Sequence, residues 1–316
     1  MAVYVNTNYS ALQGQRYLGN VQNSLTTTYQ RLSSGMRINS AKDDAAGLQI
    51  AVRLTSQING LNQGNRNASD GIALAQTVES GMDEISGMLQ KIRTLAVQAS
   101  NGTNTKEDRI ALSKEASSLA NEISRIADQT TFAGKKILKG YHDTEGIYEP
   151  TKNQGAQNGS TGRLTLQVGS NKGDTISFEV KSFMFSAVVT DAGHDGLLTD
   201  GGAAAGTPIN IAGGVITIAL TEVNDNQELI QVMDDMISKV DGARADLGAI
   251  QNRLESSIRN QSNVAANEAD ARSRIRDADF AEESANLSQQ SIIQQAAASM
   301  LMQANTRPQL GLSLLG

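Results

Sequence analysis

The sequence contains no cysteine and no tryptophan, and it has only two histidines and three prolines among its 316 residues. Without cysteine, a disulfide framework and thiol chemistry are both impossible. Aromatic residues make up only 3% of the chain, whereas compact cores and ligand pockets depend heavily on aromatic bulk. This composition favours long helices that pack side by side over a compact enzyme core.

Charge and hydropathy exclude two further classes of partner. The chain has 27 basic and 33 acidic residues, a net charge of −6, and phosphate binding requires an excess of lysine and arginine. We therefore expect no nucleic acid partner. No apolar run approaches the length of a membrane span, so we expect no membrane partner. Residues 1–8 lack the basic and apolar segments of a cleavable secretory signal, so export would need another route.

The first helical pattern covers residues 4–33. Its apolar or small residues recur in alternating steps of three and four, as in a coiled-coil seam. These residues are Tyr4, Ala11, Leu18, Val21, Leu25 and Leu32. One such helix buries too little surface to be stable alone. Gly35 and the serines and asparagine around it predict a helix end and a connector that reaches Ser40.

Two much longer helical patterns begin near Asp43 and near Asp225. Each keeps a heptad spacing of apolar residues over about fifty residues, far beyond the average of roughly 11–12 in globular proteins. A pattern of this length predicts a rod of packed helices. Thr105 and Asp108 have the spacing of a capping box. They predict a shorter helix that returns antiparallel beside the first long one.

The middle of the chain, from about residue 140 to about 221, is rich in glycine, threonine, aspartate and asparagine. Residues 164–168 and 175–180 alternate with period two and predict a β-hairpin. Residues 215–220 predict a third strand, and residues 190–214 predict loops. A small β-rich insertion is the expected result.

The C-terminal part mirrors the N-terminal part. Residues 270–277 are dense in charge and predict a second connector. A last helix is expected from Phe280 to Asn305, ended by Pro308. The apolar tail that begins at Leu310 has no partner in its own sequence, and we expect it to be buried between subunits.

Together these patterns predict a mainly α fold, namely a long α-helical rod with coiled-coil terminal helices and a small β-rich central insertion. We expect three domains. Residues 1–40 and 277–316 form a terminal-helix domain. Residues 41–182 and 225–276 form the helical rod with its β-hairpin. Residues 183–224 form a small variable outer domain.

No catalytic, cofactor or metal site is expected. His142 and His194 stand alone in the loop-rich middle and are interpreted as solvated loop residues. No metalloprotease helix, paired-cysteine metal site, phosphate-binding loop or serine nucleophile motif is present. The sequence therefore indicates a protein that is not an enzyme and that needs no cofactor.

Several motifs at the two ends resemble those of one family, the bacterial flagellins. The motifs lie at residues 32–48 (LSSGMRINSAKDDAAGL), 67–79 (NASDGIALAQTVE), 248–254 (GAIQNRL), 275–283 (IRDADFAEE) and 303–305 (QAN). They occur in the family's order, and the resemblance covers about residues 1–140 and 225–316. The middle of the chain carries no such resemblance.

The resemblance implies a structural subunit that self-assembles into the helical flagellar filament used for motility. It implies secretion through the flagellar type III export channel and an extracellular location. The residues expected to carry assembly are Leu18, Val21, Leu25, Leu32, Ile293, Ala297, Met300, Leu301, Leu312 and Leu314. Two alternatives remain. One is a hook–filament junction (hook-associated) protein, which shares the terminal pattern. The other is an enzymatic flagellin, although the middle is short and lacks a zinc-binding motif.

The resemblance also implies partners besides other subunits. The innate immune receptor Toll-like receptor 5 would contact Lys91, Leu95 and Glu115. Lys91 replaces the arginine that is typical of well-recognised members, and lysine keeps the charge but lacks the planar fork. An export chaperone would bind the last helix at Leu287, Ile293, Met300 and Leu301. Hook-associated and cap proteins complete the expected partners.

Overall fold

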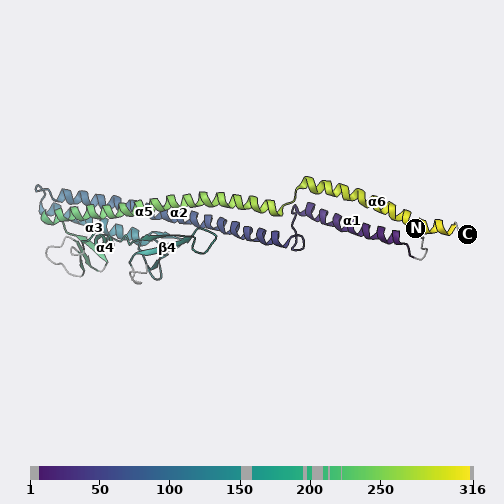
Figure 1. Cartoon of the computed structure of the whole chain (residues 1–316). Helices are drawn as coiled ribbons and strands as arrows, with labels where there is room; N and C mark the ends of the chain where they lie inside the picture. Colours follow the sequence, from purple (N-terminus) through teal and green to yellow (C-terminus); the bar gives the residue numbers. More distant parts are fainter. Residues whose placement is uncertain are drawn as a thin grey trace. The chain divides into compact units, whose positions relative to one another are not determined.

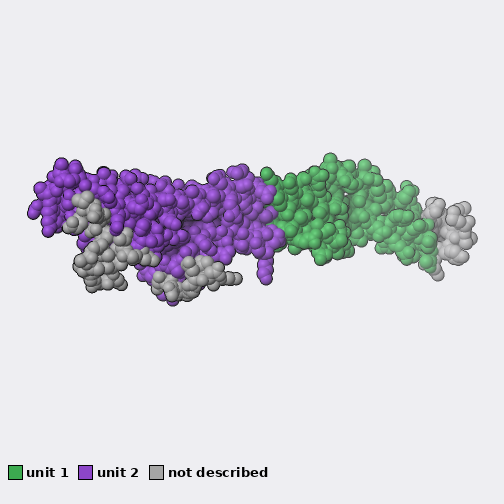
Figure 2. All heavy atoms as spheres, turned by 60° about the vertical axis from the view of Figure 1, so that its left-hand side comes forward, with its two compact units in different colours: residues 1–59, 263–316 green, residues 60–262 purple. Residues whose placement is uncertain are grey.

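A computed structural model describes residues 7–150, 159–194, 198–200, 209–212, 214–221 and 223–313. Within these ranges the chain forms six helices and eight short strands (Figure 1). The contacts divide the chain into two compact units, coloured separately in Figure 2. Unit 1 comprises residues 1–59 and 263–316, and unit 2 comprises residues 60–262. The mainly α fold with long helices and a small β-containing middle is confirmed.

Unit 1 contains the two terminal helices, α1 (Tyr9–Ser34) and α6 (Phe280–Ser313). Asn8 begins α1, because its side chain accepts a hydrogen bond from the amide of Ala11 at 3.1 Å. Gly35 ends it in the left-handed conformation, with φ of 69°, that glycine adopts at low cost. Asn8 is therefore the N-cap residue of α1, and asparagine is one of the residue types preferred at that position.

Two predicted boundaries in this unit are wrong. The helix α5 (Val223–Arg276) continues through most of the segment expected to be a connector. Asp270 and Arg274, one helical turn apart, form an ion pair of 3.0 Å that supports this last stretch. The expected stop at Pro308 is also absent, and α6 continues to Ser313. A proline inside a helix removes one hydrogen bond and costs about 3 kcal/mol, but it need not end the helix.

Unit 2 is built around antiparallel segments of α2 (Ala45–Ala99) and α5. Cross-helix contacts fix their direction, since Glu79 accepts a hydrogen bond from Gln251 and Arg93 pairs with Asp234. The helix α3 (Lys106–Gln129) returns beside α2 as predicted. The capping box is confirmed, because Thr105 and Asp108 each accept a hydrogen bond from the other's backbone.

The predicted hairpin is confirmed as β4 (Gly162–Gln167) and β5 (Thr175–Val180), which pair antiparallel in full register. The predicted third strand is β8 (Val215–Ile218). The remaining short strands are β1 (Thr131–Phe132), β2 (Lys135–Lys136), β3 (Glu149–Pro150), β6 (Leu198–Asp200) and β7 (Ile209–Ala212).

The expectation of loops throughout residues 190–214 is wrong, because β6 and β7 lie there and pair with each other, and β7 also pairs with β8. The helix α4 (Phe185–Asp191) was also not expected. Strands of three or four residues are too short to show a reliable alternation. The seven residues of α4 include three consecutive β-branched residues, Val188, Val189 and Thr190, which lower helix propensity.

The hairpin packs directly against α2 at three helical glycines. A side-chain methyl on Gly60 would lie 2.7 Å from the Cβ atom of Ser170, and one on Gly64 would overlap the carbonyl of Val168. A methyl on Gly71 would overlap the side chain of Leu166. These glycines therefore leave the space that the hairpin occupies.

A row of polar side chains on α3 covers the outer edge of β8. Ser113, Ser117 and Asn121 are spaced four residues apart, so they share one face of the helix. Asn121 accepts from the amide of Ile216 at 2.9 Å and donates to its carbonyl at 2.8 Å. Ser117 accepts from the amide of Ile218 at 2.8 Å. The strand edge is thereby paired with side chains rather than with another strand.

The main core of unit 2 joins buried residues of α2, α3, α4, α5, β5, β7 and β8, and a smaller cluster of Ala68, Val168 and Leu254 lies at the hairpin. The main core includes Ile85, Leu89 and Ile92 of α2, Ile123 of α3, and Phe185 of α4. The division into three domains, with residues 183–224 as a separate outer domain, stays a prediction.

Candidate functional site

The terminal helices α1 and α6 lie side by side and antiparallel within unit 1 (Figure 1). Near one end, the side-chain nitrogen of Asn8 donates to the carbonyl of Ala304 at 2.7 Å. Toward the other end, Nη1 of Arg31 lies 3.0 Å from Oε1 of Glu283. These two contacts, one near each end of α1, fix the direction and register of the pair.

One stripe on each helix is partly or fully buried. Its members recur in steps of three and four, as in a coiled-coil seam. On α1 they are Ala11, Gly14, Leu18, Val21, Leu25, Thr28 and Leu32; on α6 they are Glu283, Leu287, Gln290, Gln294, Ala297, Leu301 and Ala304. The two stripes meet, since a methyl group on Gly14 would lie 3.2 Å from Cδ1 of Leu301.

The residues expected to carry assembly therefore fall into two groups. Six of them lie in the intrachain stripe: Leu18, Val21, Leu25, Leu32, Ala297 and Leu301. Ile293 and Met300 lie outside it, with 42% and 71% of their surface exposed. Leu312 belongs to α6, and Leu314 lies outside the described residues. The sequence pattern did not separate the intrachain stripe from the exposed positions.

Large apolar side chains remain uncovered on both helices. We call them the outer surface, defined as Tyr9, Leu12, Tyr17, Tyr29, Phe280, Ile292, Ile293, Met300 and Met302. Each has two fifths or more of its surface exposed, even though α1 and α6 already cover each other. This helix pair therefore offers large apolar side chains to a partner.

The two connectors of unit 1 hold each other through backbone hydrogen bonds. The amide of Arg37 donates to the carbonyl of Arg276 at 2.7 Å, and the amide of Ala278 donates to the carbonyl of Gly35 at 3.0 Å. Ile38, only 1% exposed, anchors this junction. The sequence showed two connectors but gave no signal that they pair.

Asp43 organises the N-terminal connector. Its carboxylate accepts hydrogen bonds from the amides of Ser40 and Asn39 and from the Ser40 hydroxyl. The backbone bond from Ser40, followed by the hydroxyl bond, lowers the pKa of Asp43 below its ordinary value. The turn before α2 is therefore held by an ionised carboxylate at neutral pH.

The residues expected to contact an immune receptor lie in unit 2. Lys91 on α2 and Glu115 on α3 are exposed. Leu95 is 9% exposed and belongs to the core. Of the three, the two charged residues are thus the accessible ones in this conformation.

The two histidines lie in the β-containing middle of the chain. Nε2 of His194 lies 2.9 Å from Oδ2 of Asp235, so the prediction that His194 stands alone is wrong. The bond from His194 lowers the pKa of Asp235. No group of three or more metal-ligating side chains exists in the described part of the chain. Among the described helices, none has the length and apolarity to cross a membrane.

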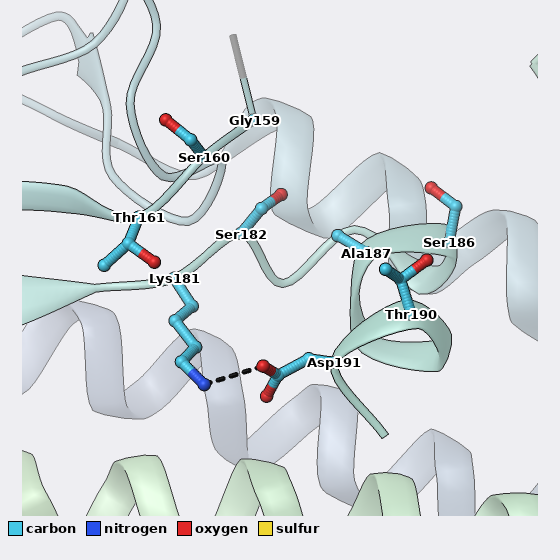
Figure 3. A pocket seen from close by; sticks show the side chains of 9 residues that line it. All are labelled: Gly159, Ser160, Thr161, Lys181, Ser182, Ser186, Ala187, Thr190 and Asp191. Carbon is cyan, nitrogen blue, oxygen red and sulfur yellow. Dashed lines mark hydrogen bonds and ion pairs between the residues drawn. The ribbon is translucent and has the colours of Figure 1, made fainter. Parts of the chain in front are cut away.

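A hollow of about 450 Å³ lies between the start of β4, the end of β5 and α4 (Figure 3). Hydroxyl side chains line it, among them Ser160, Ser182 and Thr190, and Nζ of Lys181 pairs with Asp191 at 2.7 Å across its mouth. The hollow is therefore bordered by hydroxyl groups and by one ion pair.

Comparison with known proteins gives concordant matches at both ends and along the whole chain. The family profile "Bacterial flagellin N-terminal helical region" matches residues 5–143, and "Bacterial flagellin C-terminal helical region" matches residues 230–315. Flagellin D of Vibrio anguillarum is 38% identical over 378 aligned residues, and Flagellin C of Vibrio cholerae serotype O1 is 37% identical over 378. Both alignments cover 100% of each chain.

One solved structure, described as a flagellar hook-associated protein from Vibrio parahaemolyticus, covers 74% of this chain and 100% of its own length. Its TM-score is 0.53 and its sequence identity is 16%. A likeness at this identity shows the fold alone.

Proposed function

Since this chain belongs to the bacterial flagellin family, we propose that the outer surface of α1 and α6 joins its subunits into the flagellar filament. The chain is a structural subunit of that filament, and the family is structural rather than enzymatic. The observation that carries the proposal is the set of exposed apolar side chains on a helix pair whose inner stripe is already covered.

The composition of the outer surface supports a head-to-tail contact between subunits. Tyr9, Leu12 and Tyr17 belong to α1, whereas Ile292, Ile293 and Met300 belong to α6. Contact between the α1 residues of one subunit and the α6 residues of the next would be heterologous, and heterologous contacts that do not close into a ring generate helical filaments. A symmetric dimer would instead use one face twice.

The domain roles follow from this assignment. Residues 1–40 and 277–316 would form the filament-core domain, residues 41–182 and 225–276 the rod domain, and residues 183–224 the outer domain. We infer that the chain is not an enzyme. The hook-associated alternative is not favoured, because the relatives that match over their full length are named flagellins.

Binding of an export chaperone at the four predicted residues of α6 would require a change in the terminal helix pair. Leu287 and Leu301 lie in the stripe that α1 covers, whereas Ile293 and Met300 are exposed. A partner that binds all four must therefore separate α6 from α1. This supports binding to the unassembled chain before its delivery to the extracellular filament.

Contact with Toll-like receptor 5 is proposed through Lys91 and Glu115, the accessible members of the predicted set. Leu95 would support their helix from the core rather than bind directly. Hook-associated and cap proteins are proposed as the partners at the filament ends.

The assembly role is tested with charged substitutions on the outer surface. Ile293→Asp and Met300→Asp each place a carboxylate where burial between subunits is proposed. Because burying an unpaired charge is unfavourable, the polymer yield in a sedimentation assay should fall at least about tenfold. Val215→Asp is the matched control, because Val215 is an exposed apolar residue of unit 2. Equal polymerisation of all variants would contradict the proposal.

A further inference from the structure

Sulfur in this protein occurs only in methionine, since the chain has nine methionines and no cysteine. Oxidants that would react first with thiols in other proteins can therefore react here only with the thioether sulfur of methionine. The described methionines differ greatly in access. Met82, Met233 and Met236 are fully buried, whereas Met300 and Met302 are 71% and 66% exposed. The remaining described ones, Met36, Met88 and Met184, are half-buried.

The two exposed methionines flank the stripe that joins α6 to α1. They stand immediately before and after Leu301, which faces Gly14 of α1. Because successive helical residues are about 100° apart, the two thioethers point to opposite sides of that contact. Both belong to the outer surface, so a change in their polarity alters two flanks of α6 at once.

We propose that Met300 and Met302 are a peroxide-sensitive modification site through which oxidation of the free subunit blocks its assembly. The inference rests on the assembly role proposed for the outer surface. The sulfur of each thioether attacks one oxygen of hydrogen peroxide, and an S–O bond forms as the O–O bond breaks. Sulfur is oxidised by two electrons, and the departing hydroxide takes a proton and leaves as water.

The product explains the block. A sulfoxide is polar and rigid at sulfur, whereas the thioether is a flexible apolar group suited to interfaces. Burying the sulfoxide oxygen between subunits without a donor is unfavourable. Once a subunit is inside the filament, the same burial shields the thioethers from peroxide. The site therefore acts on unassembled subunits and spares assembled ones.

The first measurement maps oxidation by mass spectrometry in the purified full-length chain treated with hydrogen peroxide. Met300 and Met302 should react at least about tenfold faster than Met82, Met233 and Met236, which serve as internal controls. The same two residues should react about tenfold more slowly in preformed filaments. Equal rates in monomer and filament would overturn the proposal.

The second measurement follows assembly. Oxidised subunits should show a critical concentration at least about tenfold higher than untreated ones. The critical concentration of the double variant Met300→Leu/Met302→Leu should be the same before and after peroxide treatment, because leucine lacks the sulfur. Met88→Leu/Met184→Leu is the matched control and should stay sensitive. Peroxide that inhibits the first variant as strongly as wild type overturns the proposal.

Repair of the native side chains supplies a readout that needs no substitution. Treating oxidised subunits with the two methionine sulfoxide reductases should restore assembly, since these enzymes return both sulfoxide epimers to thioether. Assembly that stays blocked after repair at Met300 and Met302 overturns the inference. Failure of untreated wild-type chain to polymerise would instead contradict the assembly role itself.

Discussion

Arg31 of α1 and Glu283 of α6 form an ion pair in which the two side chains differ sharply in exposure. Their nearest atoms are 3.0 Å apart, and the side chain of Glu283 is 8% exposed while that of Arg31 is 31% exposed. The second carboxylate oxygen of Glu283 has no hydrogen-bond partner among the described residues. Arg31 is therefore the main compensation for a buried charge, and it fixes the register of the terminal helix pair.

Replacing Arg31 should loosen this pair. Arg31→Met leaves Glu283 uncompensated, and we expect the free energy of local opening of α1 and α6 to fall by about 2 kcal/mol. Amide hydrogen exchange of the two helices measures this change directly. The double variant Arg31→Met/Glu283→Met should recover most of the loss. Equal exchange in wild type and Arg31→Met would show that the pair does not hold the helices together.

Two glycines of α2 should respond to alanine in opposite directions. A methyl group on Gly64 would overlap the carbonyl of Val168, so Gly64→Ala should destabilise unit 2 by about 3 kcal/mol as the hairpin moves away. Gly87 has nothing within 4 Å of the same position, so Gly87→Ala should stabilise the helix by about 1 kcal/mol. Denaturant unfolding followed by circular dichroism compares the two. If both substitutions changed the free energy of unfolding by the same amount and in the same direction, helix propensity and not the hairpin contact would determine the effect.

Asp128 should make stability depend on acid pH. Its carboxylate accepts a hydrogen bond from Lys136 at 2.8 Å and pairs with Lys139 at 2.5 Å. The hydrogen bond from Lys136, followed by the one from Lys139, lowers the pKa of Asp128 below its ordinary value. Because the folded pKa lies below the unfolded one, the stabilisation is complete above the unfolded value and disappears as pH falls through the folded value.

The substitution Asp128→Asn tests this sign. At pH 7 it should lower the free energy of unfolding by less than about 1 kcal/mol, since the side chain is 42% exposed. The difference from wild type should shrink as the pH falls through the folded pKa of Asp128. Asp70→Asn is the control, because Asp70 makes no ion pair among the described residues, and it should leave the pH profile unchanged. A difference that grows on acidification would contradict the assignment.

Long periodic elements were predictable from the sequence, and short or mutually dependent ones were not. The heptad spacing of α1, α2 and α5 repeats over many turns, and Thr105 with Asp108 is a local signal that needs no tertiary context. The connector at residues 270–277 was misjudged because its charges form a helical i,i+4 pair, which resembles a solvated loop in composition alone.

The candidate site shows the same limit. The stripe from Leu18 to Leu32 was identified, but its partner could equally have been another subunit. Only the structure shows that α6 of the same chain covers it and that Tyr17 and Met300 remain exposed. The row Ser113, Ser117 and Asn121 was visible as polar residues at helical spacing. Its pairing with β8 depends on a strand almost a hundred residues away, which no local pattern reveals.

The terminal helix pair as the assembly element is tested most directly by negative-stain electron microscopy of three concentrated proteins. These are the full chain, a chain that lacks residues 1–40 and a chain that lacks residues 277–316. We predict long filaments from the full chain and none from either truncated chain, with helical circular dichroism retained in both. A truncated chain that still forms filaments would contradict the central claim.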